Sequence, residues 1–316
     1  MTTHSGKQSA VASPFPLRAS PHQGSRPRTP YISLIIFPIR PSWPNIHLMR
    51  DQCAAGAADH VAEAHEKRGQ GSGKDYKPFL TVRDVPSKGR VHRRPALTHG
   101  RIVHLLSDLE LSAFLLFDWH LSIVDIREQF PLDPEKTFNI AQRLGIKHPA
   151  VRGVNQVMTT DLLIDTLQSG KIVPIAISVK YREELEDERV IEKQELEKRF
   201  WEGEGVDWYL FTENEVPVTL LRNIKWLVPH IHSFDLDSND QLNTFEIINS
   251  AIQIHPEDKI SIVMKMLDEQ HQCKKGTYLA YFRHLCAQTA FTWNMAEVSY
   301  RTLKTSDLTP PEHWIN

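Results

Sequence analysis

The chain has few cysteines for its length and no long apolar segment. Three cysteines, Cys53, Cys273 and Cys286, are widely spaced among 316 residues. They make neither a CxxC pair nor a disulfide framework, so we expect free thiols in a reducing cytoplasm. The longest apolar run, residues 31–39, is much shorter than the roughly 20 residues that span a bilayer, and no signal-peptide cleavage site follows it. The sequence therefore predicts a cytoplasmic protein without a membrane span.

Several motifs of common enzyme classes are absent. The sequence contains no GxxxxGK[ST], no GxSxG and no HExxH, which argues against a P-loop ATPase, an α/β-hydrolase and a zinc protease of the HExxH type. The histidines at 92, 99 and 104 lack Cys or acidic partners at zinc-like spacing, so solvated or phosphate-facing histidines are favoured over metal ligands. The net charge of −2 does not indicate a polyanionic partner, although the distribution of charge matters more than its total.

Composition divides the chain into three parts. A hydrophobic content of 41% and a charged content of 24% are ordinary for a globular protein, and the length favours two domains and a tail. Residues 1–50 hold eight of the 20 prolines and no acidic residue, so we expect a disordered extension. A start of the natural protein at Met49 is a hypothesis. We expect one domain over residues 51–228 and a helical domain over residues 229–316.

A basic stretch begins the first of these domains. Residues 51–70 suit a short polar helix, and a glycine-rich linker over residues 69–73 ends it. Residues 66–101 hold ten Lys or Arg and three Asp or Glu. Basic side chains at this density suit DNA phosphates. The candidate DNA contacts are Lys88, Arg90, Arg93, Arg94 and Arg101. A solvated loop region with incidental charge explains the segment equally well.

The middle of the chain predicts an α/β fold. Ser107 and Glu110 form a capping-box pattern at the start of an apolar helix that runs to about residue 119. Alternation and β-branched residues predict strands at residues 123–130, 155–166, 171–180 and 206–211. A charged helix over residues 183–201 precedes the last strand, and a short helix over residues 217–227 follows it. Beyond residue 229 the pattern predicts helices at residues 243–254, 259–272, 277–290 and 295–303.

Polar residues placed on otherwise apolar elements are the candidates for chemistry. Glu110 lies in the first turn of an apolar helix, Asp161 enters an apolar strand and Lys180 ends the next strand. Ser178 and Lys180 share one face of their strand because side chains alternate along it. Carboxylates and a backbone carbonyl such as that of Val179 bind Mg²⁺ through oxygen, and Lys180 can position water or neutralise developing charge. This arrangement predicts a metal-dependent nuclease.

Each member of this set has a simpler explanation when taken alone. Glu110 completes the capping box with Ser107, which explains it without any catalytic role. Asp165 competes with Asp161 for a role on the same strand, and Lys180 can be an exposed strand end. The charged helix is explained as a solvated face over an apolar underside, although Glu192 or Lys193 is a candidate neighbour of the site.

Longer strings resemble a known family. The two most specific are Val124-Asp-Ile-Arg-Glu-Gln-Phe-Pro-Leu132 and Gln156-Val-Met-Thr-Thr-Asp161. Together with shorter matches from about residue 69 to residue 227, they resemble the TnsA family, the endonuclease subunits of heteromeric Tn-seven-type transposases. The best-known member of that family has Gln at the position of Ser178, whose shorter hydroxyl favours a water-bridged contact over a direct one.

The resemblance implies a fold, a reaction and partners. The expected fold is a restriction-endonuclease-like core followed by a smaller, mainly helical, winged-helix-like domain. The expected reaction is hydrolysis of the 5′ strands at transposon ends with Mg²⁺, for which Mn²⁺ can substitute. The implied catalytic residues are Glu110, Asp161 and Lys180, and the implied metal site adds Ser178 and Val179. The implied partners are transposon-end DNA, a DDE-type transposase (TnsB) and an AAA+ regulator (TnsC), in a bacterial cytoplasm.

Two other functions fit the same residues. A stand-alone nuclease of restriction or repair type shares the fold, but the near-neutral chain argues against unaided DNA binding. A non-catalytic assembly factor would retain the docking surfaces of a decayed nuclease, and Ser178 is the feature that suggests decay.

Overall fold

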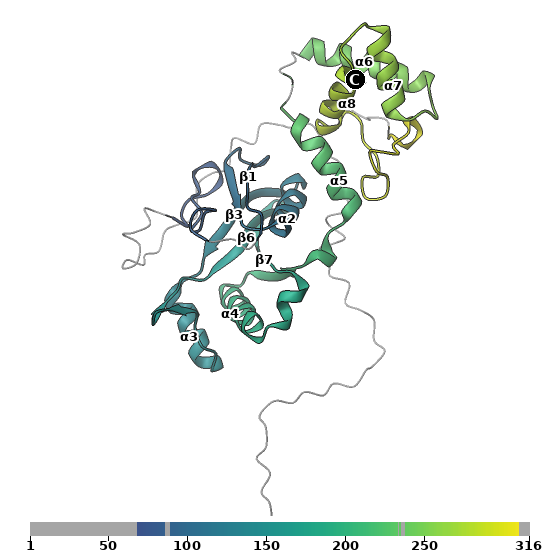
Figure 1. Ribbon diagram of the computed structural model, residues 1–316. Coiled ribbons are helices and arrows are strands. Elements are labelled where there is room, and N and C mark those ends of the chain that lie inside the picture. The colour runs from purple at the N-terminus through teal and green to yellow at the C-terminus, as the bar shows by residue number, and fades with distance from the viewer. Residues whose placement is uncertain (1–67, 86–88, 233, 235–237, 310–316) are drawn as a thin grey trace, which may run out of the picture.

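The computed structural model describes residues 68–85, 89–232, 234 and 238–309 (Figure 1). The expected disordered extension over residues 1–50, most of the expected helix over residues 51–70, and Lys88 lie outside the described residues. Most of the predicted elements fall within them. The prediction of a mixed α/β fold is confirmed.

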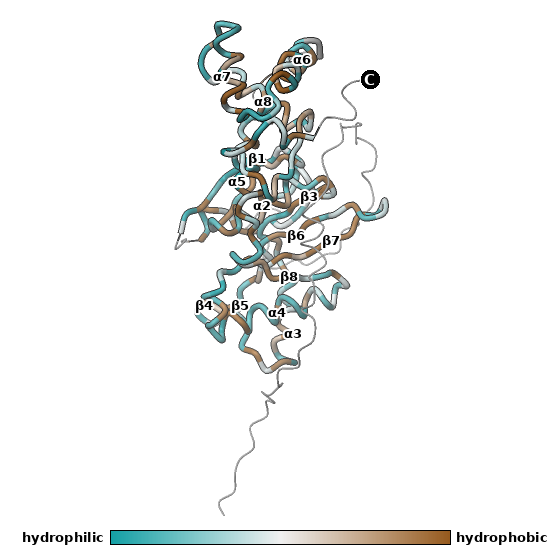
Figure 2. Tube along the Cα trace, turned by 90° about the vertical axis from the view of Figure 1, so that its right-hand side faces the viewer, coloured by the Kyte–Doolittle hydropathy of each residue, from teal (hydrophilic) through white to brown (hydrophobic). Residues whose placement is uncertain are grey.

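A four-stranded mixed sheet forms the centre of the molecule. Its strands are β3 (Ile123–Pro131), β6 (Thr159–Gln168), β7 (Lys171–Val179) and β8 (Asp207–Phe211), in the order β3-β6-β7-β8. Strand β6 pairs antiparallel with both β3 and β7, whereas β8 pairs parallel with β7. A parallel neighbour requires a crossover connection, which α4 (Glu188–Glu204) supplies. The apolar residues of β7 form a brown stretch in the middle of Figure 2.

Helices cover both faces of the sheet (Figure 1). Leu162 and Ile164 of β6 pack in a core with α2 (Asp108–Trp119) and α5 (Val218–Leu227), whereas Leu163 between them packs against α3 (Pro134–Leu144) and α4. This alternation follows from the two-residue period of a strand. The sheet is therefore buried on both sides, and polar side chains can gather to form a functional site at the ends of its strands.

Several elements were not anticipated from the sequence. Helix α3 begins with Asp133 as N-cap and Pro134 in its first turn and ends at Gly145 with φ of 66°, which is the usual chemistry of helix ends. The basic segment forms an antiparallel hairpin of β1 (His92–Pro95) and β2 (Ile102–Leu105). A short 3-10 helix, η2 (Gly73–Asp75), lies in the expected linker.

Some predicted boundaries were wrong. The strand expected over residues 155–166 begins at Thr159, because Val154–Asn155 pairs with Ala150–Val151 as a separate short hairpin, β5 with β4. The helix expected from residue 183 begins as a 3-10 turn, η3 (Arg182–Glu186), and becomes α-helical only after Asp187 caps α4. Short 3-10 turns also form η4 (Glu213–Glu215), η5 (Val228–His230) and η6 (Thr305–Asp307).

The C-terminal part is built on three helices, α6 (Ser238–Ile254), α7 (Ile260–Gln270) and α8 (Thr277–Ala287). They share a second apolar core, which also receives Leu227 from the end of α5. In Figure 1, α5 runs from the sheet toward these helices. The expected helices over residues 243–254, 259–272 and 277–290 are confirmed, with shifted ends.

The helix expected over residues 295–303 is wrong. Asn223 of α5 is fully buried, and its side-chain amide donates to the carbonyls of Met295 and Val298 at 2.8 Å each. Its Oδ1 accepts from the backbone N–H of Tyr300 at 2.8 Å. In an α-helix each of these backbone groups would bond to a residue four positions away in the same segment, whereas here the buried amide satisfies them and stabilises an irregular turn.

Two observations bear on the cysteines and on membranes. Cys273 is exposed and Cys286 is buried, and both are free thiols. Cys53 lies outside the described residues. None of the described helices has the length and apolar character needed to cross a membrane.

Candidate active site

The structure brings Asp161 and Lys180 into direct contact. Asp161 lies on β6, and Lys180 directly follows the last residue of β7. The Lys180 ammonium is 2.9 Å from Asp161 Oδ2, and the same oxygen accepts the backbone N–H of Val179 at 2.7 Å. The charge of Asp161, followed by that of Glu197, raises the pKa of Lys180 despite its burial. Lys180 is therefore a firmly protonated cation beside the carboxylate.

Glu110 caps its helix and also belongs to the site. Its backbone N–H donates to Ser107 Oγ at 3.0 Å, and its Oε2 accepts from the backbone N–H of Leu106 at 2.9 Å. The carboxylate is nevertheless only 6% exposed, although N-terminal helix residues usually lie in solvent. Burial, and then the negative charge of Asp161, raise the pKa of Glu110 to about 7. The capping and the site interpretations of Glu110 are therefore compatible.

Ser178 and Val179 complete the set expected from the sequence. Ser178 is fully buried, and its Oγ lies 3.5 Å from Asp161 Oδ2, at the limit of a hydrogen bond. The Val179 carbonyl accepts from the Lys180 ammonium at 2.8 Å. Both groups lie beside Asp161, so all of the predicted metal-site residues gather at one end of the sheet.

Glu197 is a member of this site that the sequence did not suggest. It lies on α4 at 3% exposure, and Thr160 Oγ1 donates to its Oε1 at 2.9 Å. Burial and the charge of Asp161 raise the pKa of Glu197 to about 7. Its position three residues before Phe200 places it on the apolar side of the helix. A glutamate on that side is the sequence signal that could have identified it as a buried residue. Glu192, a candidate neighbour of the site, instead pairs with Arg189 on the half-exposed side.

The candidate DNA contacts do not share one surface. Arg90 pairs with Asp108 and keeps an 81% exposed side chain. Arg93 and Arg94 are consecutive on β1, so their side chains lie on opposite faces of the hairpin. Arg93 lies opposite His104 in the hairpin, and the pKa of His104 is lowered by burial and then by the charges of Arg93 and other arginines. Arg93 therefore adds an exposed positive charge to that side of the hairpin.

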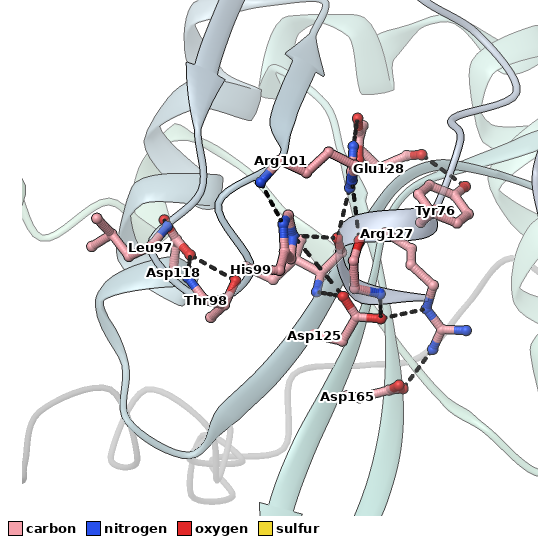
Figure 3. Close-up of polar contacts among 12 residues, drawn as sticks. Tyr76, Leu97, Thr98, His99, Arg101, Asp118, Asp125, Arg127, Glu128 and Asp165 are labelled. Atoms are coloured by element: carbon pink, nitrogen blue, oxygen red, sulfur yellow. Dashed lines mark hydrogen bonds and ion pairs between the residues drawn. The ribbon is translucent and has the colours of Figure 1, made fainter. Parts of the chain in front are cut away.

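Arg101 is an internal residue. Its guanidinium makes two bonds of 2.7 Å to the fully buried carboxylate of Glu128, and it also donates to the carbonyls of Gly73 and Ile126 (Figure 3). Around this pair, Tyr76 donates to the carbonyl of Glu128 and Arg127 donates to Asp165. With a fifth bond, from Nη1 to the carbonyl of Ile102, all five N–H donors of Arg101 are engaged, so the network fastens the basic hairpin to β3 and leaves no donor for phosphate.

The oxygen atoms at the site suit a hard divalent cation. Mg²⁺ binds proteins through one or two carboxylates and completes its shell with other oxygens and water. Glu110 and Asp161 supply two carboxylates, and the Val179 carbonyl supplies a third protein oxygen beside them. In the described part of the chain, no cluster of three or more His, Cys, Asp or Glu side chains has metal-binding geometry.

Paired carboxylates beside a lysine at one end of a sheet are typical of metal-dependent nucleases. Comparison with known proteins agrees. Residues 120–213 match the family model of the TnsA-like endonuclease N terminal, and residues 215–295 match that of the TnsA endonuclease C terminal. The chain is also 42% identical over 243 residues to the Transposon Tn7 transposition protein TnsA of Escherichia coli, which covers 77% of this chain and 88% of that protein.

The chain therefore belongs to the TnsA endonuclease family, and it is an endonuclease. Nucleases of this family generally depend on a metal ion. Asp161 and Lys180 lie inside the residues matched by the N-terminal family model, whereas Glu110 precedes them. The role of Glu110 thus rests on its burial beside Asp161 in the structure.

Proposed function

We propose that this chain is the Mg²⁺-dependent endonuclease subunit of a multi-subunit transposase, and that it hydrolyses the 5′ strands at transposon ends to permit cut-and-paste transposition. The observation that carries the proposal is the convergence of Glu110, Asp161 and Lys180 from a helix and two strands. The identity to a transposition protein over most of the chain supports the biological setting.

Four residues would hold the metal ion. The carboxylates of Glu110 and Asp161 and the carbonyl of Val179 would supply its protein oxygens, and Ser178 would assist through a hydrogen bond to a water. When bound, Mg²⁺, or Mn²⁺ in its place, activates water and stabilises negative charge on the phosphate. Glu110 must be ionised to bind a cation, which its raised pKa opposes until the cation's charge favours the carboxylate.

Lys180 supplies the positive charge of the site. Its ammonium bridges Asp161 Oδ2 and the Val179 carbonyl, so it fixes both groups relative to each other. Its side chain remains 26% exposed, which leaves one face of the ammonium open to a phosphate oxygen or to the attacking water. A protonated amine there stabilises the charge that develops on the phosphate.

We further propose a restriction-endonuclease-like core over residues 51–228 and a winged-helix-like domain over residues 229–316. The two apolar cores, which meet near Leu227 and Val228, support this boundary. The partners are transposon-end DNA, a DDE-type transposase (TnsB) and an AAA+ regulator (TnsC), in the bacterial cytoplasm. For DNA phosphates we propose Arg90, Arg93 and Arg94, with Lys88 carried over from the sequence, and we assign Arg101 to the interior.

Two aspartates of β6 provide a matched test. With transposase, Mg²⁺ and transposon-end DNA, Asp161→Asn should abolish 5′-strand cleavage and preserve 3′-end joining. Asp165→Asn, at the other end of the strand where it pairs with Arg127, should preserve both reactions. Persistent 5′ cleavage by Asp161→Asn would refute the site. Efficient cleavage by the purified chain alone would favour a stand-alone nuclease.

A further inference from the structure

Gln129 occupies an unusual position on β3. Pairing of β3 with β6 is regular on both sides of it, with Glu128 opposite Leu162 and Phe130 opposite Thr160, so Gln129 lies opposite Asp161. It is only 2% exposed, and its φ of 48° is in the left-handed region. A buried, non-glycine residue in this conformation costs free energy and persists only when its surroundings enforce it.

The surroundings of Gln129 do enforce it. Its carbonyl accepts from the backbone N–H of Phe79 at 3.3 Å, and the preceding carbonyl of Glu128 accepts from the Tyr76 hydroxyl at 3.0 Å. The left-handed residue also changes the face of the strand. Ile126 packs in the core beneath α2, whereas Phe130, which would share its face in a regular strand, packs with Trp201 of α4. The network of Figure 3 therefore holds β3 up to the residue before Gln129.

The side-chain amide of Gln129 lies between the two carboxylates of the site. Its Nε2 is 3.4 Å from Glu110 Oε2 and 3.3 Å from Asp161 Oδ1. Both distances are longer than a good N–H···O bond, and the two N–H groups of the amide allow one contact to each carboxylate. Its Oε1 accepts from Thr159 Oγ1 at 3.1 Å. The orientation follows from this pattern, because the opposite one would place Oε1 against two carboxylates.

The two oxygens that Gln129 contacts are the ones that face each other across the site. Asp161 Oδ2 is already bonded to Val179 N and Lys180 Nζ, which leaves Oδ1 toward Glu110. Glu110 Oε1 accepts from Ser107 Oγ, whereas Oε2, the oxygen that Gln129 contacts, accepts only the Leu106 backbone N–H besides it and keeps a lone pair for the site. An ion that binds both carboxylates must therefore approach the place where the Gln129 amide now lies.

We propose that Gln129 is a positioning residue that holds Glu110 and Asp161 face to face before metal binds, and that the incoming cation displaces its amide nitrogen. This inference rests on the proposed function of the site. The amide donates to both carboxylates, so it stabilises them beside each other when no metal is bound. Because the amide is neutral, the negative charge of the two carboxylates remains and still attracts a divalent cation. Metal affinity is then lower than the two carboxylates alone would give.

Calorimetric titration of the metal-free full chain with Mg²⁺, without DNA, tests this directly. Gln129→Met keeps an unbranched side chain of similar length, so it leaves the backbone conformation unchanged but removes both polar atoms. We expect a lower melting temperature without metal and Mg²⁺ binding that is about tenfold tighter, equivalent to about 1.4 kcal/mol. A Kd that is unchanged or weaker would overturn the proposal.

Control variants separate this effect from a loss of stability. Gln288→Met removes a half-buried amide that donates to the carbonyl of Ile231 in the C-terminal part, so it should lower the melting temperature without changing the Kd. Thr159→Val releases Gln129 Oε1 and should change affinity in the same direction as Gln129→Met, which provides a test if that variant does not fold. Asp161→Asn should abolish binding. If the unmodified chain binds no Mg²⁺, the proposed function fails as well.

Discussion

A single oxygen of Asp161 accepts both the Lys180 ammonium at 2.9 Å and the Val179 backbone N–H at 2.7 Å. One side of the carboxylate is thus fixed by β7, and the other oxygen is left toward Glu110. This division of one carboxylate between a structural and a reactive side explains how an acidic residue in an apolar strand can both stabilise the sheet and serve the chemistry.

Replacement of Lys180 should separate catalysis from folding. Lys180→Met removes the ammonium that faces phosphate, and we expect 5′-strand cleavage to fall by at least about 100-fold, the scale of losing one electrostatic stabiliser. The side chain is partly exposed, so the far-ultraviolet circular dichroism spectrum should be unchanged. Cleavage assays with the complete transposase give the rate. A variant with near-normal cleavage would show that Lys180 only fixes Asp161.

Stability without metal should depend on pH through Glu110 and Glu197. Each has its pKa raised from 4.5 to about 7, so the folded state binds protons more tightly than the unfolded state. The free energy of unfolding should therefore be greater near pH 5 and decrease as the pH rises through 7, by at most about 3 kcal/mol per group. Urea denaturation with chelator, at pH 5 and pH 8, measures the difference.

A variant of Glu110 isolates its share of this dependence. Glu110→Gln cannot ionise, so we expect a flatter profile of stability against pH and a smaller gain from Mg²⁺ at pH 8. A pH profile identical to that of the unmodified chain would contradict the assignment of the raised pKa to this residue.

Glu197 should act through Lys180. Its negative charge raises the pKa of Lys180, and Thr160 Oγ1 donates to its Oε1. Glu197→Gln preserves an oxygen for that hydrogen bond but removes the charge. We expect a folded protein with reduced cleavage, and an alkaline limb of the rate profile that moves to lower pH because Lys180 loses its proton more easily. An unshifted alkaline limb would assign Glu197 a purely structural role.

Two arginines of the basic segment should have opposite effects. Arg101→Ala leaves the buried Glu128 carboxylate without its cation, which should cost about 3–5 kcal/mol of stability. Arg93→Ala, at an exposed position, should leave stability unchanged, weaken DNA binding and reduce the salt slope of log K by about one unit. Thermal denaturation and fluorescence anisotropy at several salt concentrations distinguish the two. If Arg101→Ala folds and loses as much DNA affinity as Arg93→Ala, Arg101 contacts DNA after all.

Asn223 should be essential to the order of the C-terminal segment. Asn223→Leu leaves the carbonyls of Met295 and Val298 and the N–H of Tyr300 without their partner. Each unsatisfied buried group costs about 1–3 kcal/mol, so a total loss above about 3 kcal/mol is expected. Chemical denaturation measures it, and hydrogen exchange should show faster exchange at Tyr300. A loss below about 1 kcal/mol would mean that water replaces the amide.

The sequence alone determined the elements whose signals are local. Ser107 begins α2 because its hydroxyl caps the helix, and the β-branched run of residues 171–179 forms a strand because such side chains pack well on a pleated surface. Asp161 was identifiable because a carboxylate in an apolar strand needs a partner. Lys180 followed from its place at the end of the next strand.

Tertiary structure decided everything that depends on residues distant in the chain. The pattern of charges along the chain could not show that Arg101 is buried against Glu128 or that the charge of Glu197 acts on Lys180. The helical pattern of residues 295–303 could not show that the Asn223 amide holds them in a turn. Nor could the sequence place the Gln129 amide between Glu110 and Asp161, because that contact requires a left-handed residue at one point of β3. Hydrophobic periodicity fixes which face of an element is buried, whereas the partner of a buried polar group is set by the packing of whole elements.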